Sequence, residues 1–527
     1  MKDRVSLTDF LMYHKETHPI SFHMPGHKGR STLYGIYGFG DFIKNVVGND
    51  ITEIPGADAL QQPRERIKDI MEGYAGLYGA KHTELLVNGS SAGLMASILG
   101  SVPRGGKLLM GRNSHRSVYG ALRLGGIDPV YIMPEIDDET GLQLGLDPNK
   151  IEAALIKDPD IKAVLVTSPN YYGVLSDIER IASVVHLHGR ILIVDQAHGA
   201  HLKFFDYLRS EDGLPHRAAE NCGADVVVDS THKTLLSFTG SAILNICTER
   251  PDVSRISELL RMLQTTSPSY LLMGSLDINQ QILRMDGYNL IKNWDADIKY
   301  FYQEAAQIAG LGLIDRIDLD ETKVSITMSA LGISGSKLAE ELEKRNIWVE
   351  LTHGDYVMLM TGIGNERGDY EDVLSALRDL SVQYSGRIQG VKSESSASKT
   401  EPAAQNAAQK QAKNEAQAAN KNVSQPLDKI TELRTPSSDS ALIERLEQRK
   451  IPDTYEEVPL YSAEGRVLYE SIIPYPPGTP IACPGEVLSK SVILYVRDQL
   501  VAQHVVLGVD EEGRVKVESD CVLFKEI

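Results

Sequence analysis

The chain has 527 residues, of which 42% are hydrophobic, so it can bury a large core and should divide into roughly two to four domains. It carries 72 acidic residues against 54 basic ones, and the resulting net charge of −18 argues against partners such as nucleic acid or an anionic membrane. A small cationic substrate suits that charge. The four cysteines lie far apart without a C-x-x-C pair, which predicts neither a metal site nor a disulfide framework.

Residues 1–20 contain no apolar segment of the kind found in signal peptides. No apolar run in the chain is long enough to span a bilayer. We therefore expect a cytoplasmic protein.

Residues 80–250 alternate short apolar runs with amphipathic stretches, which is typical of a sheet built from βα units. Between two of these runs, Ser176 or Asp177 can cap a helix that ends near Gly189. A mostly parallel α/β core is the predicted fold class. The expected strands are 83–87, 107–110, 130–133, 162–166, 191–194, 225–228 and 242–247.

The pattern changes after residue 285, where a long helix (286–309) precedes alternating strand and helix signals. Residues 386–435 are almost free of aromatic and branched apolar side chains, so we predict a flexible linker there. The predicted divisions are an N-terminal arm (1–60), a large domain (61–285), a small α+β domain (286–385), the linker (386–435) and a C-terminal α+β domain (436–527).

Polar residues follow the expected strands at points where open α/β sheets bind their ligands. In "VNGSSAG", Gly89, Ser90 and Ser91 stand where a strand turns into a helix N-terminus, which can hold a phosphate. Asp195 ends a fully apolar strand, and Lys233 follows a later one. One helical crossover and one further strand fit between Asp195 and Lys233, so the two side chains can converge on one crevice.

His115 lies in the polar loop "GRNSHRSVYG" after another strand. Each of these residues alone has an ordinary structural interpretation, as a surface histidine, a turn or a helix cap. Together they offer a phosphate cradle, an acid for a ring nitrogen, an aromatic group to stack on the ring and a lysine for an imine. Those are the groups that pyridoxal phosphate requires, so this cofactor is predicted.

The chain resembles the ornithine/lysine/arginine decarboxylase family of pyridoxal-phosphate enzymes, in its short bacterial form. The resemblance covers nearly the whole chain apart from the linker, and it implies an aspartate-aminotransferase-like fold for the large domain. It rests on these segments in this order: "FHMPGHKG" (22–29), "DITEIPGADAL" (50–60), "NGSSAG" (88–93), "RNSHRSV" (112–118), "SPNYYG" (168–173), "VDQAHGAH" (194–201), "DSTHKT" (229–234), "QTTSPSY" (264–270) and "PPGTPIACPGE" (476–486).

The resemblance also implies roles for single residues. Lys233 matches the Schiff-base lysine, Asp195 the partner of the pyridinium nitrogen, and His115 the histidine that stacks on the ring. The remaining matches are with residues close to the imine (His198), at the phosphate (Ser90, Ser91, Ser230 and His232), and at the phosphate of a neighbouring subunit (Thr265). A homodimer or higher homo-oligomer with shared active sites follows from the last match.

Two positions depart from the family's usual pattern. Gln196 stands where a glutamate is common, and Arg116 stands where a lysine is common. Neither position carries the core chemistry.

The implied activity is decarboxylation of a basic L-amino acid, with arginine to agmatine and CO2 as the preferred assignment, in polyamine biosynthesis. Lysine and ornithine remain alternatives, as do an aminotransferase and a catalytically silent regulatory homologue. A guanidinium substrate calls for a carboxylate in bidentate geometry. Glu486 in "CPGE" is the candidate for that carboxylate and Asp58 is the second choice; a helix cap is the alternative role for Glu486.

Overall fold

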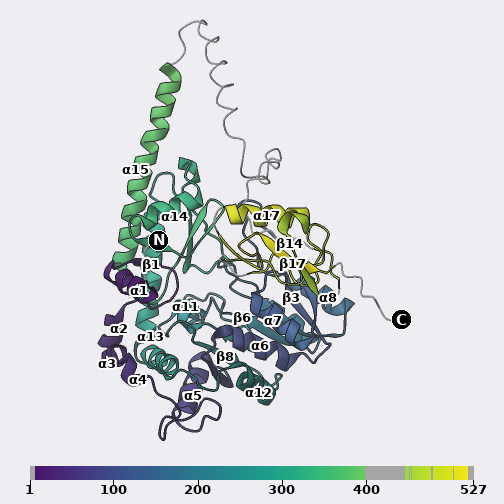
Figure 1. Ribbon diagram of the computed structural model, residues 1–527. Coiled ribbons are helices and arrows are strands. Elements are labelled where there is room, and N and C mark those ends of the chain that lie inside the picture. Colours follow the sequence, from purple (N-terminus) through teal and green to yellow (C-terminus); the bar gives the residue numbers. More distant parts are fainter. Residues whose placement is uncertain are drawn as a thin grey trace.

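The computed structural model describes residues 6–397, 446–449, 451–452, 454–475, 479–501 and 504–519 (Figure 1). Its central sheet has the strand order β2-β8-β7-β6-β5-β3-β4; β8 pairs antiparallel with both β2 and β7, and the other pairs are parallel. The prediction of a mostly parallel core is confirmed. The strands are β2 (His82–Leu86), β3 (Lys107–Gly111), β4 (Asp128–Ile132), β5 (Ile161–Thr167), β6 (Ile191–Asp195), β7 (Val226–Asp229) and β8 (Ala242–Ile246).

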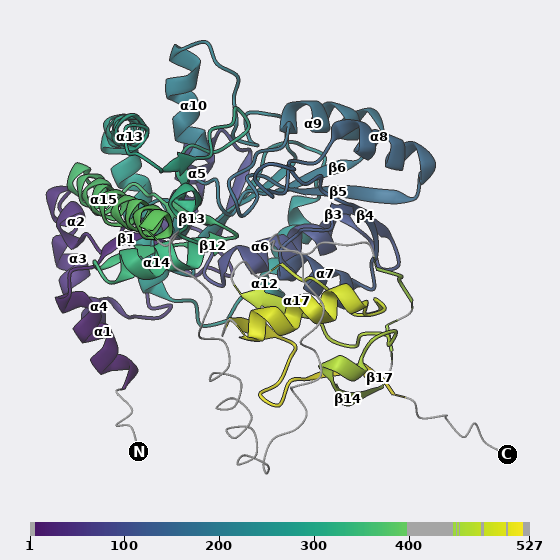
Figure 2. The same cartoon turned by 90° about the horizontal axis from the view of Figure 1, so that it is seen from above.

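Helices cover both faces of this sheet, which is why its strands are almost continuously apolar. Alternate residues point to opposite faces, so Ile193 and Val228 pack with α6, α7 and α12, whereas Leu192 and Val227 pack with α8 and α9. Figure 2 shows these two helical layers on either side of the strands. The helices of this domain are α5 (Arg66–Tyr78), α6 (Gly89–Ser101), α7 (Arg116–Gly125), α8 (Pro148–Lys157), α9 (Ile178–Leu187), α10 (Leu202–Glu211), α11 (Thr231–Thr234) and α12 (Val253–Leu263).

The helix expected near residues 176–189 is α9, and the Asp177 side chain caps it by accepting a hydrogen bond from the Arg180 N–H at 3.1 Å. Gly189 follows with a φ of +67°, a left-handed conformation that ends the helix at little cost for glycine. Of the two predicted caps, Asp177 is therefore correct.

A second, four-stranded sheet with the order β12-β13-β10-β9 forms the small domain. Helix α13 (Tyr270–Ala305) leads into it and is interrupted at Asp286, next to the expected division at residue 285. The other elements are β9 (Gly312–Leu313), β10 (Lys323–Thr327), the 3-10 helix η1 (Ser329–Leu331), α14 (Gly335–Glu343), β11 (Ile347–Val349), β12 (Leu351–His353), β13 (Tyr356–Met360) and α15 (Arg367–Ala397).

The N-terminal arm is attached to the small domain. Its strand β1 (Ile20–Phe22) pairs in parallel with β11, so that Ile20 lies opposite Ile347. The arm also contains α1 (Leu7–Glu16), α2 (Ser31–Ile36), α3 (Gly40–Lys44) and α4 (Val46–Asn49).

Helix α15 continues to Ala397, so residues 386–397 of the predicted linker are helical. The rest of the predicted linker, 398–435, lies outside the described residues.

The described part of the C-terminal domain contains two short antiparallel strand pairs and one long helix. Figures 1 and 2 both show it (yellow) beside α7 of the large domain. Cys483 from this domain is 1% exposed and belongs to the apolar cluster that α6 and α7 form with the central sheet. The elements are β14 (Tyr455–Pro459) with β17 (Arg514–Glu518), β15 (Ile473–Tyr475) with β16 (Val505–Leu507), the 3-10 helix η2 (Leu460–Ser462) and α17 (Lys490–Val501).

Among the described residues, no helix is both long and apolar enough to cross a membrane. The same residues include no cluster of three or more His, Cys, Asp or Glu side chains suited to hold a metal ion.

Candidate active site

A cavity of about 330 Å³ opens at the carboxyl ends of β5, β6 and β7. Its lining includes all the predicted site residues except Thr265, Glu486 and Asp58. The predicted residues in the lining are Ser90, Ser91, His115, Asp195, His198, Ser230, His232 and Lys233. The structure thus brings together side chains from four separate loops of the large domain, which follow β2, β3, β6 and β7.

One end of the cavity is suited to an anion. Helix α6 begins at Gly89, whose φ is +72°, and the preceding Asn88 makes no capping hydrogen bond, so the first N–H groups of the helix remain available. Ser90 and Ser91 stand in this first turn. Opposite them, the Ser230 hydroxyl is fully buried without a hydrogen-bond partner among the described residues. A buried hydroxyl without a partner is destabilising by about 1–3 kcal/mol, and a bound phosphate would satisfy it.

The middle of the cavity can hold a flat ring. The imidazole of His115 caps α7, since its Nδ1 accepts a hydrogen bond from the Ser117 N–H at 3.3 Å. The ring proton therefore resides on Nε2. Burial, together with the charges of Lys233 and Arg116, lowers the pKa of His115 to about 4, so the ring is neutral at pH 7. A neutral, fixed imidazole is suited to stack on an aromatic ligand.

Asp195 closes the bottom of the cavity at the end of β6, where it is 3% exposed. One of its oxygens accepts a hydrogen bond from the Ala197 N–H at 3.2 Å. Burial raises the pKa of Asp195, and the nearby Lys233 opposes that effect. A buried carboxylate of this kind favours a cationic partner, such as a protonated ring nitrogen.

Lys233 lies on the short helix α11, and its Nζ is 2.9 Å from Nε2 of His198. Burial lowers the pKa of Lys233 to about 8; the Lys323 charge acts in the same direction, whereas Asp195 and Glu350 oppose it. Burial also keeps the pKa of His198 well below its usual range. His198 is therefore neutral, and the edge of the Tyr171 ring contacts it with centroids 5.0 Å apart. The lowered pKa of Lys233 and the neutral His198 beside it both favour the deprotonated amine, which is the nucleophilic form.

The main chain around Lys233 is fixed by the motif "FHMPGHKG". The N–H of Gly26 donates to the His232 carbonyl at 2.8 Å, and the N–H of Ile363 donates to the Thr234 carbonyl at 3.0 Å. A Cβ atom on Gly26 would lie 2.3 Å from the Thr234 carbonyl carbon, so only glycine fits there. The arm and the small domain thus hold the segment that carries Lys233.

Gln196, one of the two departures from the family pattern, bridges the buried carboxyl group of Asp229 and the half-buried one of Glu220. Its Nε2 donates to Glu220 at 3.0 Å and to Asp229 at 2.9 Å, and the Asn245 amide donates to the same two groups. Burial and the neighbouring Glu220 raise the pKa of Asp229 well above its usual range. A glutamate at position 196 would remove the bridging donor and add a third acid.

Three predicted residues lie elsewhere. Thr265 is exposed beside the start of α6, where its N–H donates to the Asn88 side chain at 3.2 Å; it does not line its own chain's cavity. Asp58 accepts hydrogen bonds from the backbone N–H groups of residues 59, 64, 65 and 67, so it organises the start of α5. Asp58, the second candidate for a substrate ligand, therefore lies outside the cavity of its own chain, and its carboxylate is occupied by these backbone groups.

Glu486, the first candidate for a substrate ligand, also lies outside the cavity of its own chain. It is 2% exposed. It does bind a guanidinium in bidentate geometry, but that guanidinium belongs to Arg112 of the same chain, at 3.1 and 2.7 Å.

Sequence reasoning missed several residues of the cavity wall. Met24, Asn113, Tyr171 and Thr479 line it, and each lies within a motif that carried the family resemblance. These motifs were therefore the sequence signal from which the four residues could have been predicted.

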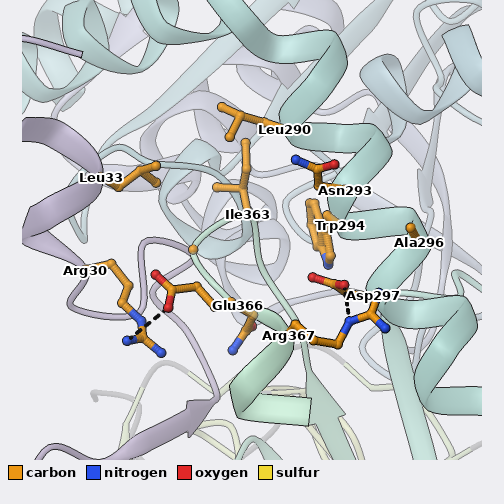
Figure 3. Close-up of a pocket in the computed structure, with 12 residues that line it drawn as sticks. Arg30, Leu33, Leu290, Asn293, Trp294, Ala296, Asp297, Ile363, Glu366 and Arg367 are labelled. Atoms are coloured by element: carbon orange, nitrogen blue, oxygen red, sulfur yellow. Dashed lines mark hydrogen bonds and ion pairs between the residues drawn. The ribbon is translucent and has the colours of Figure 1, made fainter. Parts of the chain in front are cut away.

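A second cavity, of about 360 Å³, lies between the arm, α13 and the start of α15 (Figure 3). Its charged side chains pair with one another: Arg367 with Asp297 at 2.6 Å and Arg30 with Glu366 at 3.6 Å. None of the predicted site residues lines it.

Comparison with known proteins agrees with the geometry of the first cavity. The family described as "Orn/Lys/Arg decarboxylase, major domain" matches residues 5–317, and "Orn/Lys/Arg decarboxylase, C-terminal domain" matches residues 439–508. Arginine decarboxylase of Bacillus anthracis is 29% identical over 95% of this chain and 94% of its own length. Arginine decarboxylase of Bacillus subtilis (strain 168) is 30% identical over the same shares.

Among solved structures, the constitutive lysine decarboxylase of E. coli superposes with a TM-score of 0.67 at 20% identity, covering 97% of this chain and 81% of that one. This likeness supports the fold. With the family match over more than half of its length, the chain belongs to the Orn/Lys/Arg decarboxylase family.

Proposed function

We propose that the protein is a pyridoxal-phosphate-dependent arginine decarboxylase that releases agmatine and CO2. The observation that carries this proposal is one cavity in which an anion-binding turn, a buried acid and a nucleophilic lysine face one another. The buried Ser230 hydroxyl, the free N–H groups of α6 and the neutral His115 fit the phosphate and the ring of that cofactor. Arginine is preferred because the most similar relatives named above are arginine decarboxylases.

When bound, pyridoxal phosphate supplies an electron sink for the pair of electrons left on Cα as CO2 departs. Asp195 would hold a proton on the ring nitrogen, because a carboxylate that is 3% exposed stabilises a cation next to it. The neutral imidazole of His115 would stack on the ring and hold it in place. Lys233 would supply the amine that retains the cofactor, and its Nζ could carry the proton that the product requires.

The substrate assignment is tested by incubating the purified protein and pyridoxal phosphate with arginine, lysine and ornithine in separate reactions. We expect agmatine and CO2 from arginine at the highest kcat/KM, with lysine second. Faster release of cadaverine from lysine would contradict arginine as the substrate. A keto acid in place of CO2 would indicate an aminotransferase instead.

The pKa of Lys233 predicts how cofactor uptake depends on pH. At pH 8 an amine with a pKa of about 8 is about half neutral, whereas an ordinary lysine would be only about 0.3% neutral. The rate of uptake by the apo-protein, followed as visible absorbance, should therefore rise through pH 7–9 and level off above about pH 9.

Two charge-removing variants sharpen this test. Lys323→Met should raise the pH at which the uptake rate is half-maximal, because it removes a cation near Lys233. Glu350→Gln should lower that pH, because it removes an anion. A rate that keeps rising to pH 10.5 in the parent protein would show that Lys233 has an ordinary pKa.

We also propose that the protein acts in the cytoplasm, in polyamine synthesis, and that it forms a homodimer with shared active sites. The dimer is supported by the apolar side chains that the arm exposes, among them Leu7 at 72% and Val47 at 90%. The exposure of Thr265, next to Asn88 at the start of α6, also supports it, because this residue is the one proposed to reach the active site of a second copy. Analytical ultracentrifugation tests the dimer, and a monomer with full activity would contradict it.

A further inference from the structure

A buried side chain of the large domain, Arg112, binds the C-terminal domain beside the active-site wall. Arg112 follows β3 in the large domain and is 2% exposed, yet its guanidinium is extensively hydrogen-bonded. Besides Glu486, it donates to the carbonyls of Pro480 and Ile481 at 2.8 and 3.4 Å and to the Tyr119 hydroxyl at 3.0 Å. All but the last of these acceptors belong to residues 480–486 of the C-terminal domain.

Glu486 has a matching role within its own loop. Its Oε2 accepts a hydrogen bond from the Cys483 N–H at 2.7 Å in addition to the one from Arg112. The carboxylate therefore holds the "CPGE" turn in shape and binds that turn to the large domain at the same time. The ring of Tyr119 lies 5.5 Å from the guanidinium and helps to exclude water from the pair.

Both partners of this ion pair are close in sequence to the cavity wall. Arg112 precedes His115 by one short turn, and Pro480 directly follows Thr479. His115 and Thr479 both line the cavity. Because the Arg112 guanidinium binds the Pro480 carbonyl, any shift of the pair would move these two walls relative to each other.

We propose that Arg112 and Glu486 are positioning residues that lock the C-terminal domain in place, so that the Thr479 hydroxyl contacts the amino-acid substrate. The proposal rests on the decarboxylase function stated above. It gives the C-terminal domain a part in substrate binding.

The direct test compares kinetics and cofactor uptake. Thr479→Val removes the hydroxyl but keeps the shape, so it should raise KM for arginine about five- to tenfold, as expected for one lost hydrogen bond. Cofactor uptake and Tm should stay at parent values. A parent KM in this variant would overturn the substrate contact.

The coupling is tested by a double-mutant cycle. Glu486→Gln should raise KM, and Arg112→Lys should do the same because an ammonium cannot replace the bidentate fork. In either background, adding Thr479→Val should raise KM by less than twofold, since the hydroxyl is already displaced. Fully additive effects would overturn the positioning role, as would an Arg112→Lys variant with parent KM.

Hydrogen exchange gives a readout that does not depend on catalysis. In Glu486→Gln, exchange should accelerate in peptides covering residues 112–119 and 479–488, with and without cofactor. Glu470→Gln, which breaks an exposed ion pair with Lys516 in the same domain, is the matched control and should leave both peptides unchanged. Unchanged exchange in Glu486→Gln would overturn the positioning role of the Arg112–Glu486 pair. Absence of decarboxylation in the parent protein, with the exchange result as expected, would instead reject the proposed function alone.

Discussion

Replacing Lys233 by alanine should abolish turnover, with a loss on the order of 10⁴-fold or more in kcat, as for removal of other covalent nucleophiles. The visible absorbance of the bound cofactor should disappear as well. The fold should survive, because the segment around Lys233 is fixed by backbone hydrogen bonds from Gly26 and Ile363 that an alanine retains. CO2 release, absorbance and thermal unfolding measure the three effects separately.

Lys323→Met provides the control for this experiment. Lys323 is also completely buried, but it does not line the cavity, so this variant should keep the visible absorbance. Normal turnover by Lys233→Ala would remove the central residue of the proposed mechanism.

Asp195→Asn should take up the cofactor but lose most of its activity, by about 10²- to 10⁴-fold in kcat. An amide has the shape of the carboxylate, but it cannot stabilise a protonated ring nitrogen in a site that is closed to water. Absorbance titration measures uptake, and CO2 release measures turnover. Near-normal turnover in this variant would point to a different electron sink.

The strands of the central sheet could be predicted to within two residues because both of their faces are covered, which leaves apolar runs with clear ends. The carboxyl ends of such strands meet at one edge, so residues as distant in sequence as Ser90 and Lys233 could be assigned to one site. The sequence pattern therefore contained both the ends of the strands and the grouping of the residues that follow them.

The partners of single side chains could not be predicted in the same way. An acid after "PG" has the same local sequence whether it binds a substrate or Arg112, and only the packing of two domains decides between the two for Glu486. Likewise, nothing near Gly26 indicates that its Cα faces the chain at Thr234. These contacts join segments hundreds of residues apart, which local patterns do not describe.

Gln196 illustrates an intermediate case. The resemblance identified it as a departure from the family, but its function depends on Glu220 and Asp229, whose carboxyl groups its side-chain amide bridges. The position could be singled out from sequence, whereas the reason required the structure.

The buried ion pair also has a consequence for synthesis on the ribosome. Arg112 and Glu486 are 374 residues apart, so at 5–20 residues per second the arginine emerges about 20 to 75 s before its counter-ion. An unpaired guanidinium cannot be buried during that time, and the loop that carries His115 must stay hydrated. The central sheet can form early, but the pocket matures last. A ribosome that stops before codon 486 would release a folded sheet with an open, inactive site.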